Sequence, residues 1–187
     1  VRGGVANSEM VTSRAARAGL MFSYTCELVA LGIWIGGLVV IIASVIPAVF
    51  NSFGMEPGGR YLTRVFDGYN RLVMAAIVVM VGAAAFRFWA ATYGGMTDAV
   101  LTKAELALFG AMIVVVALIV FAIGPELAAL QERAFKAQDE ATRKAALNVF
   151  FRSHTIVRGL YLLNLTLGVL LLGVKVRGWV SQGTTDL

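Results

Sequence analysis

A single histidine stands among basic and aromatic side chains near the start of the last apolar stretch. His154 is the only histidine of the 187 residues, in the segment NVFFRSHTIVRGLYLLN. Arg158 and Tyr161 follow it at spacings of four and three residues, which places all three on one face of a helix. An imidazole in this setting suits the axial ligation of a haem or chlorin, one ligand of a copper ion, or the binding of an anionic head group.

His154 also has a structural interpretation. An apolar run begins at Ile156, so the imidazole is expected at the membrane–water boundary, one turn into the fourth helix. Glu126 follows the third apolar stretch and belongs to the same side of the membrane. We favour a hydrogen bond between His154 and Glu126 that latches the fourth helix to the third.

Three ionisable residues mark the opposite side of the expected bundle. Glu27 begins the first apolar stretch, Arg87 lies near the end of the second, and Glu105 begins the third. In antiparallel helices they share one side at similar depth, and a charge in hydrocarbon needs a partner. We predict a structural ion pair between Glu27 and Arg87. A proton pathway would need further polar residues across the middle of the second and third stretches.

The sequence lacks the usual signatures of soluble enzymes. It contains no glycine-rich phosphate loop, no HExxH motif and no GxSxG motif. One cysteine, Cys26, excludes an internal disulfide. The net charge of +5 comes from residues scattered over loops and helix ends, where anionic lipid rather than nucleic acid is the expected partner. The sequence therefore predicts neither an enzyme nor a resident cofactor.

The composition predicts a membrane protein. Hydrophobic residues make up 59% of the chain and charged residues 14%, against roughly 25% charged residues in soluble domains. Four long runs almost free of charge are typical of membrane spans. The predicted fold is an all-α integral membrane four-helix bundle with both termini on the same side. If the source is bacterial, its location is the inner (plasma) membrane.

The expected organisation is one four-span domain over residues 19–178, with flexible tails at 1–18 and 179–187. Its helices are predicted at about 20–50, 66–93, 103–136 and 142–176. Lysine and arginine are nearly balanced between the two sides, so the positive-inside rule leaves the orientation undecided.

Small residues on two of these helices predict close packing. Gly32 and Gly36 lie four apart in the first helix, and Pro47 continues roughly the same face and should bend it. Asn164 and Gly168 repeat the pattern in the fourth helix. We expect these residues to form helix–helix contacts.

Three segments carry a family resemblance: ALNVFFRSHTIVRGLYLLNLTLGVLLLG, LGIWIGGLVVIIASVIPAVFNSF and GPELAALQERA. They resemble small four-helix membrane proteins like transmembrane protein 205 and bacterial relatives that share a domain of unknown function. The matching residues are Phe151, Arg152, His154 and Asn164 in the last helix and Trp34 and Gly36 in the first. The resemblance implies a four-helix membrane bundle and little chemistry. WIGGL is distantly similar to CopD-type copper-resistance domains, but their several histidines and methionine-rich motifs are missing.

These observations favour a non-enzymatic integral membrane protein. Its expected role is that of a structural or accessory subunit that contacts the lipid bilayer and other membrane subunits or a second copy of itself. The alternative is a haem-, chlorin- or copper-binding membrane protein that uses His154. A small transporter or membrane enzyme is the third hypothesis.

Overall fold

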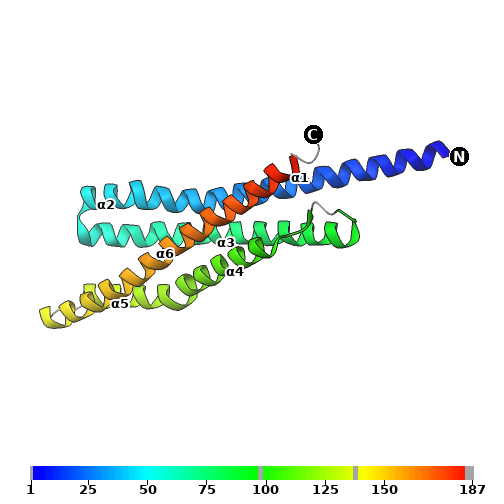
Figure 1. Ribbon diagram of the computed structural model, residues 1–187. Helices are drawn as coiled ribbons and strands as arrows, with labels where there is room; N and C mark the ends of the chain where they lie inside the picture. Colours follow the sequence, from blue (N-terminus) through cyan, green and yellow to red (C-terminus); the bar gives the residue numbers. More distant parts are fainter. Residues whose placement is uncertain (1, 97–98, 137–138, 184–187) are drawn as a thin grey trace.

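The chain folds into long α-helices that run side by side (Figure 1). The computed structural model describes residues 2–96, 99–136 and 139–183, and no strand occurs within these ranges. The elements are α1 (Arg2–Val40), η1 (Ile41–Val45), α2 (Ile46–Phe53), α3 (Met55–Tyr93), α4 (Lys103–Ala117), η3 (Leu118–Ile123), α5 (Gly124–Lys136) and α6 (Glu140–Gly183). The predicted all-α fold is confirmed.

Four helical stretches are long and apolar enough to cross a membrane, as predicted. They are Ala15–Phe53, Pro57–Tyr93, Lys103–Leu130 and Arg152–Gly178. The helices extend further than the sequence suggested. α1 begins at Arg2, inside the segment expected to be a tail, and α6 continues to Gly183. α3 begins at Met55, earlier than the predicted start at residue 66, and follows Gly54, whose φ of 73° favours glycine.

Two of the four spans contain a π-helical segment directly before a proline. η1 ends two residues before Pro47, and η3 ends two residues before Pro125. A proline inside a helix has no N–H to donate, and its ring crowds the carbonyl four residues earlier. A wider π turn accommodates that conflict without ending the helix. The bend expected at Pro47 thus takes the form of a local widening, and the same device recurs at Pro125.

The spans form two antiparallel pairs that cross each other. α1 and α2 pack along α3, α4 and α5 pack along α6, and α1 also contacts α6. The N-terminal part of α1 and the C-terminal part of α6 lie at the same end of the bundle (Figure 1). At the other end, α5 and the first part of α6 diverge from α2 and α3, so that the bundle forks there (Figure 1).

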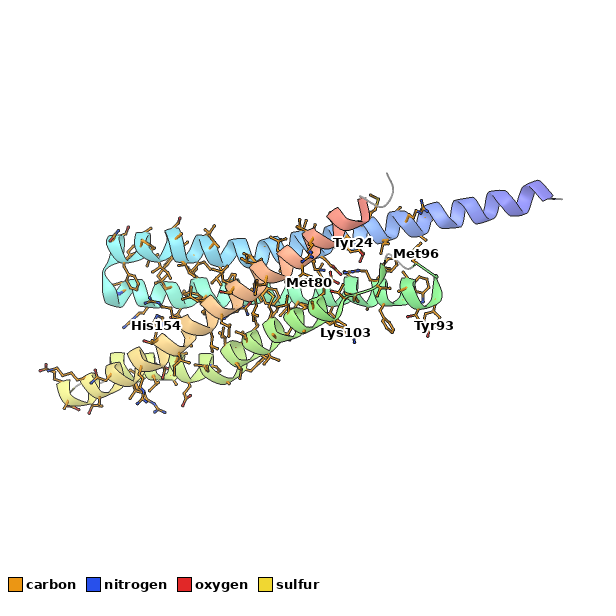
Figure 2. All side chains as sticks on the ribbon, viewed as in Figure 1. Tyr24, Met80, Tyr93, Met96, Lys103 and His154 are labelled. Atoms are coloured by element: carbon orange, nitrogen blue, oxygen red, sulfur yellow. The ribbon has the colours of Figure 1, made fainter. Side chains whose placement is uncertain are left out.

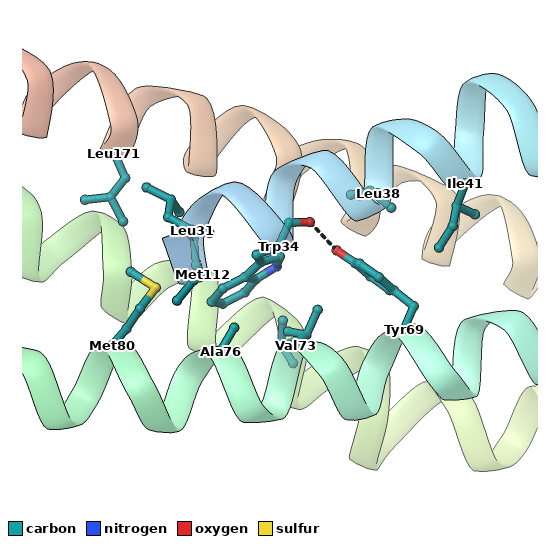
Figure 3. Packing of buried hydrophobic residues seen from close by; sticks show 12 residues of the cluster. Leu31, Trp34, Leu38, Ile41, Tyr69, Val73, Ala76, Met80, Met112 and Leu171 are labelled. Carbon is teal, nitrogen blue, oxygen red and sulfur yellow. Dashed lines mark hydrogen bonds between the residues drawn. The ribbon is translucent and has the colours of Figure 1, made fainter. Parts of the chain in front are cut away.

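Buried positions follow a heptad-like spacing along each helix. In α3 the buried side chains include Tyr69, Val73, Ala76, Met80, Ala83, Arg87 and Ala90. Alternating steps of three and four residues keep one narrow seam facing the neighbouring helices. Trp34, Leu31 and Met112 fill the centre of the resulting core, and the Tyr69 hydroxyl donates a hydrogen bond to the Trp34 carbonyl at 2.9 Å (Figure 3).

The outer faces of the helices are apolar and exposed within the chain. Phe88, Phe121 and Val78 are each at least 64% exposed. Such side chains are suited to contact lipid tails. Because lipid is as apolar as these side chains, the bundle depends on close packing and internal polar bonds rather than on the hydrophobic effect.

Close packing uses only some of the predicted small residues. A Cβ placed on Gly168 would lie 2.8 Å from Ile35 Cγ1, and one on Gly37 would lie 3.1 Å from the Tyr69 ring. Gly32 and Gly36 instead lie on the exposed face of α1, where such a Cβ would have no described atom within 4 Å beyond the adjacent residues and backbone of its own helix. Gly168 therefore packs inside the bundle, whereas any close contact at Gly32 and Gly36 requires another molecule.

Candidate functional site

Four charged side chains are buried together near the end of the bundle at which α1 begins and α6 ends. Each spanning helix contributes one, and we call the set the charge quartet: Glu27, Arg87, Glu105 and Lys175. Their side chains are between 2% and 8% exposed. Tyr24 and Met96, labelled in Figure 2, lie at this end, away from His154 at the other.

Within the charge quartet each cation contacts both carboxylates. Arg87 Nη1 lies 3.0 Å from Glu27 Oε2, and Arg87 Nη2 lies 3.5 Å from Glu105 Oε2. Lys175 Nζ donates to Glu27 Oε2 and lies 3.6 Å from Glu105 Oε1. The contacts form a closed ring of alternating sign with no net charge. The ring joins all four spans through side chains far apart in sequence.

Local structure fixes two members of the quartet. The Glu105 carboxylate accepts a hydrogen bond from the Thr102 backbone N–H at 2.9 Å, and Thr102 Oγ1 accepts one from the Glu105 N–H at 3.1 Å. This capping box begins α4 and holds the carboxylate at the helix start. The Arg87 guanidinium lies over the Tyr24 ring, 4.3 Å from its centroid, a cation–π arrangement.

The connection between α3 and α4 covers the quartet. Ala99 is fully buried, and together with Met96 it packs against Leu20 and Ala90. The Val100 carbonyl, on the same connection, accepts a hydrogen bond from Arg87 Nη2 at 3.5 Å. Beside the quartet lies a cavity of about 20 Å³ lined by Glu27, Glu105 and Lys175, among others. That volume accommodates a water molecule.

The geometry makes the quartet a lock between helices. A single charge in a low-dielectric interior costs several kcal/mol, and this cost is offset only by close opposite charges and hydrogen bonds. Here each charge depends on side chains from other spans, so separating any span exposes an unpaired charge.

Among the described residues, no group of three or more His, Cys, Asp or Glu side chains is arranged to hold a metal ion.

A second, uncharged polar network lies further towards the fork. Tyr161 on α6 donates a hydrogen bond to Asn70 Oδ1 on α3 at 3.1 Å. The Asn164 amide donates to the Met112 carbonyl on α4 at 3.2 Å. The Tyr161 ring packs at 5.2 Å from Phe66 and 6.3 Å from Tyr69, centroid to centroid. These bonds tie α6 to α3 and α4.

The residues proposed for a ligand at His154 differ in their exposure. His154 and Arg158 are exposed on α6, one turn apart. Tyr161, predicted on the same face, is partly buried and donates its hydroxyl hydrogen to Asn70. Glu126 is exposed on α5, which packs along α6. The hydrogen bond between His154 and Glu126 stays a prediction.

The structure brings Glu27 and Arg87 together, and it adds two partners that the sequence analysis did not assign. The sequence analysis placed Glu105 at the correct end without a partner, and it gave Lys175, near the end of the helix predicted at 142–176, no contact inside the bundle. The missing signal is the seam spacing of α6, in which Asn164, Gly168, Leu171 and Lys175 follow at steps of four, three and four. A lysine that continues the buried face of a helix is expected inside the bundle.

Comparison with known proteins places the chain in a family. Residues 29–136, more than half of the chain, match the model of a domain of unknown function (DUF4149). The chain belongs to this family. No curated protein and no solved structure matches it. Arg87 and Glu105 lie inside the DUF4149 match, whereas Glu27 and Lys175 lie outside it.

The charge quartet generates a stability prediction. Replacing Glu27 by glutamine or Arg87 by methionine leaves an unbalanced charge in the bundle. Each change should lower the free energy of unfolding by about 3–5 kcal/mol. The double variant retains the balanced pair of Glu105 and Lys175, so its free energy of unfolding should fall by less than the sum of the two single decreases. Thermal or denaturant unfolding of the four proteins in one detergent measures the coupling.

The exposed pair of Glu132 and Lys136 provides the matched control. Its side chains are 65% and 75% exposed, and the adjacent ammonium lowers the pKa of the Glu132 carboxyl. Solvent screens such pairs, so the corresponding cycle should show no measurable coupling. Additive losses in the Glu27–Arg87 cycle would contradict a lock.

His154 has its own prediction. If it latches α6 to α5 by a hydrogen bond, His154→Gln keeps a polar group that can form the bond and should retain the thermal stability of the wild type. His154→Ala should lower it. Equal loss of a bound pigment or metal with both substitutions would instead identify a ligand. The measurements are unfolding curves, absorption spectra and metal content of each purified variant.

Proposed function

We propose that this DUF4149 protein is a non-enzymatic structural membrane protein, an accessory subunit of a larger membrane assembly. Its bundle supplies a stable four-span body, and its outer surface contacts lipid and other membrane subunits or a second copy of the chain.

The closure of the charge quartet carries the proposal. Charged residues inside membrane bundles often mark substrate or proton pathways. Here the two cations and two carboxylates contact one another across all four spans. The side chains with the greatest capacity for chemistry are therefore engaged in holding the helices together. A structural role accounts for all four charges without a further ligand.

The outer surface supports the second half of the proposal. In the most apolar 18-residue segment of each span, only 22–28% of the segment is buried inside the chain. Most of the helical surface is therefore available to lipid or neighbouring proteins. On α1 that surface includes Gly32 and Gly36, where another helix can approach closely. Such an approach would seat α1 against a partner helix.

A haem- or chlorin-binding protein is the second candidate, and the exposure of His154 on α6 favours it. The cavity beside the charge quartet measures about 20 Å³ and one lined by Tyr161 and Asn164 about 10 Å³, both far smaller than a macrocycle. A macrocycle, or a copper ion, would therefore bind on the outer face at His154 and Arg158. A small transporter or membrane enzyme remains the third candidate.

The specific kinship with transmembrane protein 205 is also part of the proposal. It rests mainly on the Phe151, Arg152, His154 and Asn164 pattern in α6, outside the DUF4149 match, and also on Trp34 and Gly36 in α1, inside that match. Such kinship would relate this bundle to other small four-span proteins. It adds no catalytic residue.

The proposal predicts association through α1. In native mass spectrometry after gentle extraction, the wild type should exceed the 19.9 kDa of one chain by the mass of further copies or subunits. Gly36→Leu should weaken this association because leucine blocks close approach of a helix, while the unfolding temperature of the isolated chain stays the same. Gly82→Leu, at an equally open position on α3, is the matched control and should retain the assembly.

Two results would contradict the accessory role. One is a wild-type chain that remains single under extraction conditions that preserve other membrane complexes. The other is a visible absorption band or stoichiometric copper in that protein, which would favour the second candidate.

A further inference from the structure

A small polar cavity lies in the interior of the bundle where all four spans meet. It measures about 10 Å³. Its polar lining consists of Trp34 from α1, Tyr69 and Asn70 from α3, and Tyr161 and Asn164 from α6. Val73, Val116 and Ile119 complete the wall. The cavity is separate from the charge quartet, whose own cavity has a different lining.

One atom in this wall lacks the partner that its chemistry requires. Asn164 is 2% exposed, and its Oδ1 has no hydrogen-bond partner. Its amide nitrogen is already directed at the Met112 carbonyl, so exchanging the two amide atoms would set oxygen against oxygen. A buried amide oxygen without a donor is costly, above all in a bilayer, where bulk water cannot supply one.

The other polar side chains of the cavity wall can accept or donate further hydrogen bonds. The Tyr69 hydroxyl donates to the Trp34 carbonyl and the Tyr161 hydroxyl to Asn70 Oδ1, which leaves each phenol oxygen free to accept from a further donor. The indole N–H of Trp34 is a donor only. The wall thus contains an amide oxygen and phenol oxygens as acceptors, and the Trp34 indole and the Asn70 amide nitrogen as donors.

We propose that the cavity binds one water molecule that donates a hydrogen bond to Asn164 Oδ1. A water needs a cavity of about 10–15 Å³ and two to four polar partners, and this site offers both. The second hydrogen of the water is directed to a tyrosine hydroxyl oxygen. The water then completes a polar layer that joins α6 to α1 and α3, between the charge quartet and the fork of the bundle.

A double-mutant cycle tests the water site through thermal stability. Val116→Ile adds one methylene to the cavity wall and should expel the water. In the protein that keeps Asn164, this change leaves Asn164 Oδ1 without a hydrogen-bond donor and should lower Tm by roughly 3 °C or more. In an Asn164→Leu background no water is needed, so the same change should leave Tm unchanged or raise it. Val115 is buried but does not line the cavity, so Val115→Ile should change Tm equally in both backgrounds.

Direct observation of the water keeps the proposal testable if Asn164→Leu fails to fold. In protein labelled with ¹⁵N-asparagine and held in lipid nanodiscs, the Asn164 side-chain amide should show a cross-relaxation signal to long-lived water. This signal should disappear in Val116→Ile. Absence of the signal in the wild type, or equal effects of Val116→Ile in both backgrounds of the cycle, would overturn the proposal.

Discussion

The bundle depends on the mutual neutralisation of the charge quartet. Hydrocarbon gives apolar helices no reason to prefer one another over lipid, so their association must come from packing and internal polar bonds. Burying one charge alone would oppose folding. Burying two cations and two carboxylates, one from each span, makes every helix necessary to the others. The same charges therefore specify which helices meet, and at which depth.

Other features follow from that constraint. The connection between α3 and α4 must cover the quartet, and the burial of Ala99 and the Arg87–Val100 hydrogen bond achieve this. At the other end no such ring occurs among the described side chains, and the helix pairs diverge (Figure 1). The network of Tyr161, Asn70 and Asn164 lies between these regions and supplies uncharged ties. The π turns before Pro47 and Pro125 allow two spans to remain continuous.

The sequence predicts the spans well because apolar run length alone determines them. It places Glu27 and Arg87 at one end, since antiparallel connection fixes depth. It does not show which charges meet, because that depends on the rotation of each helix about its axis, a property of packing. Lys175 illustrates this: its position near the end of an apolar stretch suggests a charge at the membrane–water boundary, whereas its register with Asn164 and Leu171 directs it inward. Gly32 and Gly36 illustrate the converse, since their spacing suits close packing but their face of α1 is directed outward.

The ionisation state of the two buried carboxylates tests the charge quartet most directly. Isotope-edited infrared spectroscopy on protein with ¹³C-labelled glutamate carboxyl groups, in lipid at neutral pH, distinguishes carboxylate from carboxylic acid. Difference spectra between the wild type and Glu27→Gln or Glu105→Gln assign each band. A closed ring of ion pairs predicts that both substitutions remove an ionised carboxylate band. Loss of a protonated carboxylic acid band in either difference spectrum would contradict it, because a neutral glutamic acid cannot balance Arg87 and Lys175.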